Sequence, residues 1–157
     1  MALILCIETS SKNCSIAISD NGKSTFLKEK LDDNYCHGEK LHILIEELLV
    51  DSNISIADFD AFSFSSGPGS YTGLRIGASA IKGFAFALEK PVILITTLKA
   101  MALGCLTFEL TNKKKYDLLC PVMDSREGEI YIAMYDSDLN EILKPFCCEV
   151  SSFSFLK

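Results

Sequence analysis

The strongest constraint on the fold is a glycine-rich segment, residues 66–75, with the sequence Ser-Gly-Pro-Gly-Ser-Tyr-Thr-Gly-Leu-Arg. A strand is predicted before it, over residues 59–65, and a helix after it that ends near Leu88. Arg75 and Lys82 are the only charged residues of that helix. A helix that is apolar on all sides has to be covered on more than one face. We therefore expect close packing around this helix, to which another subunit can contribute.

One stripe of the expected helix carries mostly small side chains, which allow a second helix to approach closely. Its members are Ile76, Ala80, Gly83 and Ala87. A glycine inside a helix costs about 1 kcal/mol relative to alanine. Gly77 and Gly83 therefore indicate a packing requirement at their positions.

The glycine-rich segment lies where a phosphate-binding loop is expected, between a strand and the N-terminus of a helix. Its spacing matches neither standard fingerprint, because both require glycine at the position of Thr72. Two interpretations stay open, a tight turn that packs helix on sheet and an anion or nucleotide loop. The residues of the second interpretation are Gly67, Gly69, Ser70, Thr72, Gly73 and Arg75.

The chain before this segment is expected to form an antiparallel meander followed by a helix. Strands are predicted at residues 3–8, 14–19 and 24–31, with a hairpin turn at Asp20-Asn21-Gly22. Residues 36–52 show the apolar periodicity of a core-facing helix. Ile43 and Val50 fall on its charged side. They either contact a partner or are ordinary exposed apolar residues.

The chain after this segment is expected to add further strands and one helix. Strands are predicted at residues 91–96, 118–123, 129–135 and 146–156, a helix at residues 98–106, and a charged connection at residues 124–129. This order is typical of an α/β fold. A strand-rich lobe as short as the last third of the chain rarely covers a sheet alone. We therefore expect a complete first lobe over residues 1–105 and an incomplete second lobe over residues 106–157.

The composition excludes several functional classes. The 157 residues include 15 Lys and Arg against 21 Asp and Glu, a net charge of -6. Strong independent binding to nucleic acid is not expected, because it needs clustered basic groups. No apolar segment approaches the ~20 residues that cross a membrane. The seven cysteines are scattered, without a C-x-x-C pair, which favours a reduced, cytoplasmic protein.

Candidate acid–base and metal-binding residues are few. The two histidines, His37 and His42, are five residues apart and lack the i, i+4 spacing of a helical metal pair. Glu8 follows the first strand, where it either caps a turn or contacts a metal–nucleotide. The triplet of lysines at residues 113–115 either contacts RNA or is simply solvated. We expect no metal site and no catalytic residue.

The motifs taken together resemble those of the TsaB (YeaZ) family. The matching segments are Ile7-Glu-Thr-Ser10, Cys14-Ser-Ile-Ala17, His37-x-Glu39, the glycine-rich block through Gly77, Pro91-Val92, Thr97-Leu98 and Asp124-Ser-Arg-Glu-Gly-Glu-Ile-Tyr131. Many family members have Asp at the position of Glu8, and most continue well beyond residue 157.

The resemblance implies the actin/Hsp70/sugar-kinase (ASKHA) fold, with two RNase H-like lobes. It implies a role in the synthesis of threonylcarbamoyladenosine (t6A) on tRNA, as a non-catalytic scaffold that dimerises with TsaD, the subunit that transfers the threonylcarbamoyl group. The ATPase TsaE joins the complex, tRNA is contacted only indirectly, and the chain alone forms a homodimer. No intrinsic cofactor is expected, although the family resemblance allows ATP or ADP at a partner interface.

The resemblance also implies that the first-lobe helices form the subunit interface. The residues expected there are His37, Ile43, Val50, Ile76, Ala80, Gly83 and Ala87. The alternative function is a small ASKHA-type phosphotransferase or ATPase that uses Glu8 and the loop at residues 67–73.

Overall fold

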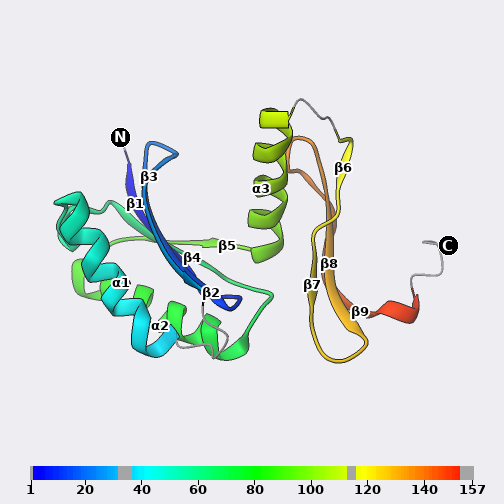
Figure 1. The fold of residues 1–157 in the computed structure, drawn as a ribbon, viewed down its shortest axis with the longest axis horizontal. Helices are drawn as coiled ribbons and strands as arrows, with labels where there is room; N and C mark the ends of the chain where they lie inside the picture. Colours follow the sequence, from blue (N-terminus) through cyan, green and yellow to red (C-terminus); the bar gives the residue numbers. More distant parts are fainter. Residues whose placement is uncertain (1, 32–36, 113–115, 153–157) are drawn as a thin grey trace. The chain divides into compact units, whose positions relative to one another are not determined.

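The computed structural model describes residues 2–31, 37–112 and 116–152, with the backbone alone at residues 37, 108–112 and 152. The chain divides into two compact units, Met1–Ile95 and Thr96–Lys157. Figure 1 shows the elements of each unit. The expected mixture of helices and strands is confirmed.

The first unit is built on a five-stranded sheet with the order β3-β2-β1-β4-β5. Its strands are β1 (Leu3–Glu8), β2 (Asn13–Asp20), β3 (Lys23–Leu31), β4 (Ala61–Ser65) and β5 (Val92–Ile95). The first three pair antiparallel, whereas β4 and β5 add in parallel. The predicted hairpin turn is confirmed, with φ of 50° at Asn21 and 78° at Gly22.

Two helices, α1 (His37–Ser52) and α2 (Tyr71–Leu88), pack against one face of this sheet (Figure 1). A short 3-10 helix, η1 (Ile56–Asp58), follows α1 and is capped by Ser55. The shared core joins alternate residues of the central strands to the apolar stripe of α1. Its buried members include Leu5, Ile7, Ile16, Ile18, Phe62, Leu41, Ile45, Leu48 and Ile81. The predicted core-facing side of α1 is therefore confirmed.

The second unit packs α3 (Thr97–Asn112) on a four-stranded sheet. The long strand β8 (Glu129–Asp136) pairs with β6 (Leu118–Leu119), β7 (Val122–Asp124) and β9 (Glu141–Glu149). The 3-10 helix η2 (Val150–Ser152) follows β9. Leu98 and Ala102 of α3 are buried in one cluster with Leu119, Ala133 and Tyr135.

Several predicted boundaries in this unit were wrong. α3 extends beyond the expected range 98–106 and reaches Asn112. The strand expected at residues 118–123 is two strands, because Pro121 has no N–H to donate to a ladder. Of the strand expected at residues 146–156, residues 146–149 belong to β9, which begins at Glu141, residues 150–152 form η2, and residues 153–156 lie outside the described residues. The units divide between residues 95 and 96, before the expected boundary at 105/106, because α3 packs into the second core.

Candidate functional site

The glycine-rich loop closes onto the segment that follows β1. The Ser70 amide donates a 2.7 Å hydrogen bond to the Ser10 carbonyl oxygen, and the buried Thr9 hydroxyl donates to the Gly73 carbonyl oxygen over 2.8 Å. Gly69 has a φ of +154°, and a Cβ there would lie 2.5 Å from the Ser10 carbonyl oxygen. Only glycine allows the two backbones to approach this closely.

Two amide groups at the start of α2, those of Gly73 and Leu74, donate hydrogen bonds to Ser70. Ser70 is the N-cap of α2, and its hydroxyl oxygen accepts from the Gly73 amide at 3.3 Å. Its carbonyl oxygen accepts from the Leu74 amide at 2.9 Å. Thr72 and Arg75 are exposed on α2. The observed bonds are those of a packed turn that fixes the helix on the sheet.

Glu8 joins the ends of β1 and β4, which are neighbours in the sheet. Its Oε1 accepts a 2.6 Å hydrogen bond from the Ser10 amide, and the Ser65 hydroxyl donates to Oε2. The carboxylate therefore caps the turn after β1, one of the two roles considered for it. Nearby, burial raises the pKa of the Cys14 thiol, and the negative charge of Glu8 raises it further. Cys14 is thus held as a neutral thiol.

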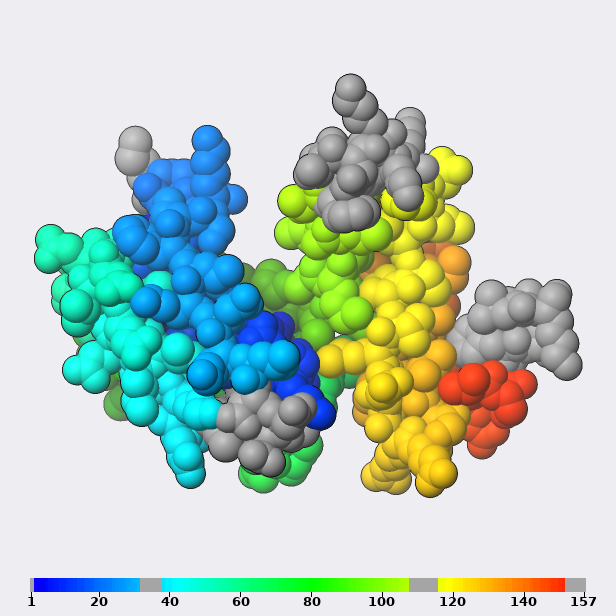
Figure 2. All heavy atoms as spheres, in the orientation of Figure 1, coloured from blue at the N-terminus to red at the C-terminus, as the bar shows by residue number. Residues whose placement is uncertain are grey.

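A second candidate site is the surface of α1 and α2 that points away from the sheet, here called the outward face. Ile43 and Val50 are 55% and 73% exposed, which confirms their predicted position outside the core. Tyr71 and Phe86 of α2 are 73% and 89% exposed, and they had not been singled out from the sequence. In a helical projection Phe86 falls between Arg75 and Ser79, so an aromatic residue on the polar side was the available signal. In the space-filling view α1 lies on the visible surface (Figure 2).

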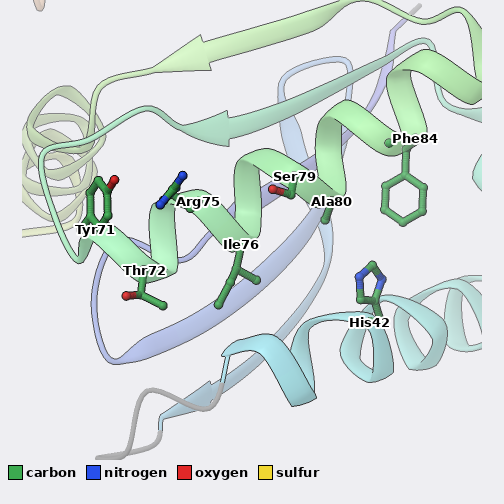
Figure 3. Close-up of a pocket in the computed structure, with 9 residues that line it drawn as sticks. His42, Tyr71, Thr72, Arg75, Ile76, Ser79, Ala80 and Phe84 are labelled. Atoms are coloured by element: carbon green, nitrogen blue, oxygen red, sulfur yellow. The ribbon is translucent and has the colours of Figure 1, made fainter.

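A groove of about 620 Å³ lies in the first unit, lined by His42 of α1 and by residues of α2. His42 points toward Phe84, with their ring centroids 6.1 Å apart in an edge-on arrangement (Figure 3). At the other end the Arg75 guanidinium lies 5.0 Å from the centre of the Tyr71 ring, a cation–π contact. The rest of the lining consists of Thr72, Ile76, Ser79, Ala80 and Gly83.

The groove brings together part of the interface predicted from the sequence. Ile76, Ala80 and Gly83 line it, whereas Ala87 is exposed but does not. His37 begins α1, and its side chain lies outside the described ones. A Cβ at Gly83 would meet no atom within 4 Å, while one at Gly77 would lie 2.5 Å from the Thr9 hydroxyl oxygen. A packing requirement within the chain is therefore found at Gly77 and not at Gly83.

The remaining candidate segments lie elsewhere or outside the described residues. The charged connection at residues 124–129 joins β7 to β8 as an antiparallel hairpin, with Gly128 at a φ of 77°. The lysines at 113–115 lie outside the described residues. Within the described ranges no group of three or more His, Cys, Asp or Glu is arranged to hold a metal. No helix among the described residues is both long and apolar enough to cross a membrane.

The fold first defines a class of protein. An antiparallel meander continued by parallel strands, with helices on one face, is the RNase H-like lobe of the ASKHA fold. A structure described as YeaZ from Pseudomonas aeruginosa superimposes with a TM-score of 0.81 at 24% identity, over 95% of this chain and 68% of that chain. The likeness establishes the same fold.

Sequence comparison then gives the family. The family model for TsaD, tRNA N6-adenosine threonylcarbamoyltransferase, matches residues 10–154. The tRNA threonylcarbamoyladenosine biosynthesis protein TsaB of Haemophilus influenzae is 34% identical over 130 residues, 83% of this chain and 52% of that protein. TsaB of Escherichia coli is 32% identical over 139 residues, 88% of this chain and 57% of that protein. The chain belongs to this family as a TsaB (YeaZ)-type member, and it spans little more than half the length of these two relatives.

Proposed function

We propose that this chain is a subunit of the machinery that makes t6A on tRNA, and that it binds a TsaD-type subunit through the outward face of α1 and α2. In this proposal it is a non-catalytic scaffold, and the partner carries out the transfer reaction. TsaE and tRNA join through the assembled complex, and the place for ATP or ADP is where the partner meets the chain. Without the partner, the same face pairs with a second copy.

The observation that carries the proposal is the exposure of large apolar side chains on the outward face. Phe86 is 89% exposed, and Val50 and Tyr71 are each 73% exposed. Complete burial of an aromatic or aliphatic side chain of this size contributes about 1.5–3 kcal/mol. Tyr71 also lines the groove. Exposed apolar patches on a protein surface mark interaction sites.

The charges of the outward face restrict what can cover it. The exposed charged residues of α1 include Glu39, Glu46 and Glu47, whereas those of α2 are Arg75 and Lys82. A partner has to bring basic groups to α1 and acidic groups to α2, since like charges at an interface are strongly unfavourable. A second copy meets this requirement when α1 of each chain faces α2 of the other.

A scaffold role is also supported by how the polar groups of the first unit are used. Glu8 accepts hydrogen bonds from the Ser10 amide and the Ser65 hydroxyl, and Ser70 accepts from the Gly73 amide. Glu8, Ser70 and Gly73, which belong to the site of the alternative ATPase, thus have bonding roles within the fold. ATP turnover by the purified chain alone would favour the ATPase over the scaffold.

The test is complex formation with the TsaD protein of the same organism, measured by size-exclusion chromatography with light scattering and by titration calorimetry. We expect a one-to-one complex with the original chain. Phe86→Ser should weaken it by about 30-fold or more, which corresponds to the loss of a ~2 kcal/mol interface hot spot. Phe86 is almost fully exposed, so its replacement should not unfold the chain.

The matched control is Leu27→Ser. Leu27 is 58% exposed and lies on β3. Its replacement therefore also removes an exposed apolar side chain, but one that does not belong to α1 or α2. This variant should bind as the original chain does. Absence of any complex with the original chain would overturn the proposed function. Equal binding by the two variants would place the interface elsewhere.

A further inference from the structure

Three sulfur-containing side chains of the second unit border one small pocket, apart from the surfaces described above. Met101, Cys105 and Cys120 line a pocket of about 220 Å³. Its other lining residues are Ala102, Leu119 and Pro121, none of which carries a charge or a polar side-chain atom. Sulfur is therefore the only side-chain donor atom that the pocket offers.

Local structure accounts for this gathering of sulfurs. Met101 and Cys105 are four residues apart on α3, so both side chains lie on the same side of the helix. Cys120 lies between β6 and β7, where Pro121 interrupts the ladder to β8. Ala102 and Leu119 are buried and hold the helix and the strand together. The pocket is thus formed by packed elements on two sides.

The chemistry of the lining selects one class of ligand. Thiolate and thioether sulfur are soft donors, which prefer soft cations such as Cu(I) and do not suit Mg²⁺ or Ca²⁺. A structural zinc site usually has four nitrogen or sulfur ligands, whereas two thiols and one thioether match the low coordination number of a monovalent soft cation. We propose that this pocket is a binding site for a soft monovalent cation, with Cu(I) as its representative.

Cys105 and Cys120 are free thiols in the structure, as the proposal requires. Both are exposed, so a cation can reach them without unfolding of the chain. Binding replaces the proton of each thiol with a sulfur–metal bond and releases the proton to solvent. The Met101 side chain is 42% exposed, and its thioether binds as a neutral third ligand.

The test is a Cu(I) titration of the reduced chain under anaerobic conditions, with bathocuproine disulfonate as the competing chromogenic chelator. We expect one Cu(I) per chain at this site and a sulfur-only first shell in the X-ray absorption spectrum. Cys105→Ser and Cys120→Ser should each weaken binding by about 100-fold or more. Loss of a hydrogen bond to a metal ligand already lowers metal affinity by about 10–100-fold, and loss of a direct ligand should cost at least as much. Met101→Leu should weaken it less, because a neutral ligand is lost.

The matched controls are Cys147→Ser and Cys148→Ser, which change a neighbouring pair of cysteines on β9. Both should bind Cu(I) as the original chain does. Circular dichroism and thermal unfolding would establish that every variant is folded. The proposal is overturned if the original chain does not compete with the chelator, or if the affinity falls in the β9 variants and not in the pocket variants.

Discussion

At the scale of single residues, the buried thiol of Cys14, which lies near Glu8, should make the stability of the chain depend on pH in a measurable way. Burial and the charge of Glu8 raise its pKa above the ordinary value of 9.0, so the unfolded chain loses this proton first as the pH rises. The contribution of the buried thiol to the free energy of unfolding is fully present below about pH 9 and is lost as the pH rises toward the raised pKa. In Cys14→Ala, the free energy of unfolding should therefore fall less steeply between pH 8 and pH 10 than in the original chain.

Urea denaturation at a series of pH values measures this difference. One titrating group contributes a slope of at most about 1.4 kcal/mol per pH unit. Cys105→Ala is the control, because it removes an exposed cysteine in place of the buried one. Equal slopes for Cys14→Ala and the original chain would contradict the assigned environment of Cys14.

Single residues also show where sequence reasoning succeeded and where it stopped. The exposed positions of Ile43 and Val50 followed from the helical period alone and are confirmed. Phe86 was missed, although its helical projection between Arg75 and Ser79 marks it as an aromatic residue on the polar side of α2. The partner of Gly77, the Thr9 hydroxyl, is 68 positions away along the chain. No local pattern contains such a contact.

At the scale of elements, the two interior glycines of α2 should respond in opposite ways to the same substitution. Gly77→Ala places a Cβ 2.5 Å from the Thr9 hydroxyl oxygen and disturbs the buried bond from Thr9 to Gly73. It should destabilise the chain by about 1–3 kcal/mol. Gly83→Ala meets no atom within 4 Å and should stabilise by up to about 1 kcal/mol through helix propensity. Chemical denaturation of both variants gives the comparison.

The two glycine variants control for each other, since both remove the same backbone freedom from α2. Destabilisation by Gly83→Ala in the isolated chain would mean that this part of α2 is covered by a second copy. Tolerance of Gly77→Ala without loss of stability would mean that Thr9 moves away easily. In that case the turn after β1 would be less tightly packed than the structure indicates.

The elements themselves were predicted best where one physical signal dominated. The meander and α1 followed from alternation, a turn sequence and a helical stripe, and their bounds were nearly correct. The second unit was predicted less well. Its short strands β6 and β7 form by pairing with β8, and they are too short to show a clear strand pattern in their own sequence. α3 was predicted too short, since the residues after Leu106 lack a clear apolar period.

At the scale of the whole molecule, the division into two units was expected, but its position was not. The boundary at 105/106 was predicted because the chain after about Leu106 is rich in strand patterns and short of helix patterns. Burial of Leu98 and Ala102 with Ala133 and Tyr135 decides the matter, because packing partners define a unit. Chain order alone does not contain that information.

The position of this boundary leads to a prediction about the first unit. Among the described residues, its sheet and its main core cluster draw only on residues up to 95, and its outward face belongs to the same residues. Residues 1–95 should therefore fold cooperatively alone and bind TsaD about as tightly as the full chain. A chain of that size buries roughly two thirds of its surface on folding, which is sufficient for independent stability.

Urea unfolding and calorimetry on the 1–95 fragment would test both parts of this prediction separately. A single cooperative transition together with unchanged affinity would assign both the fold and the interface to the first unit. A folded fragment that binds weakly would mean that residues 96–157 contribute contacts to the partner. A fragment without a cooperative transition would mean that the first core depends on the second unit, even though none of its buried members comes from there.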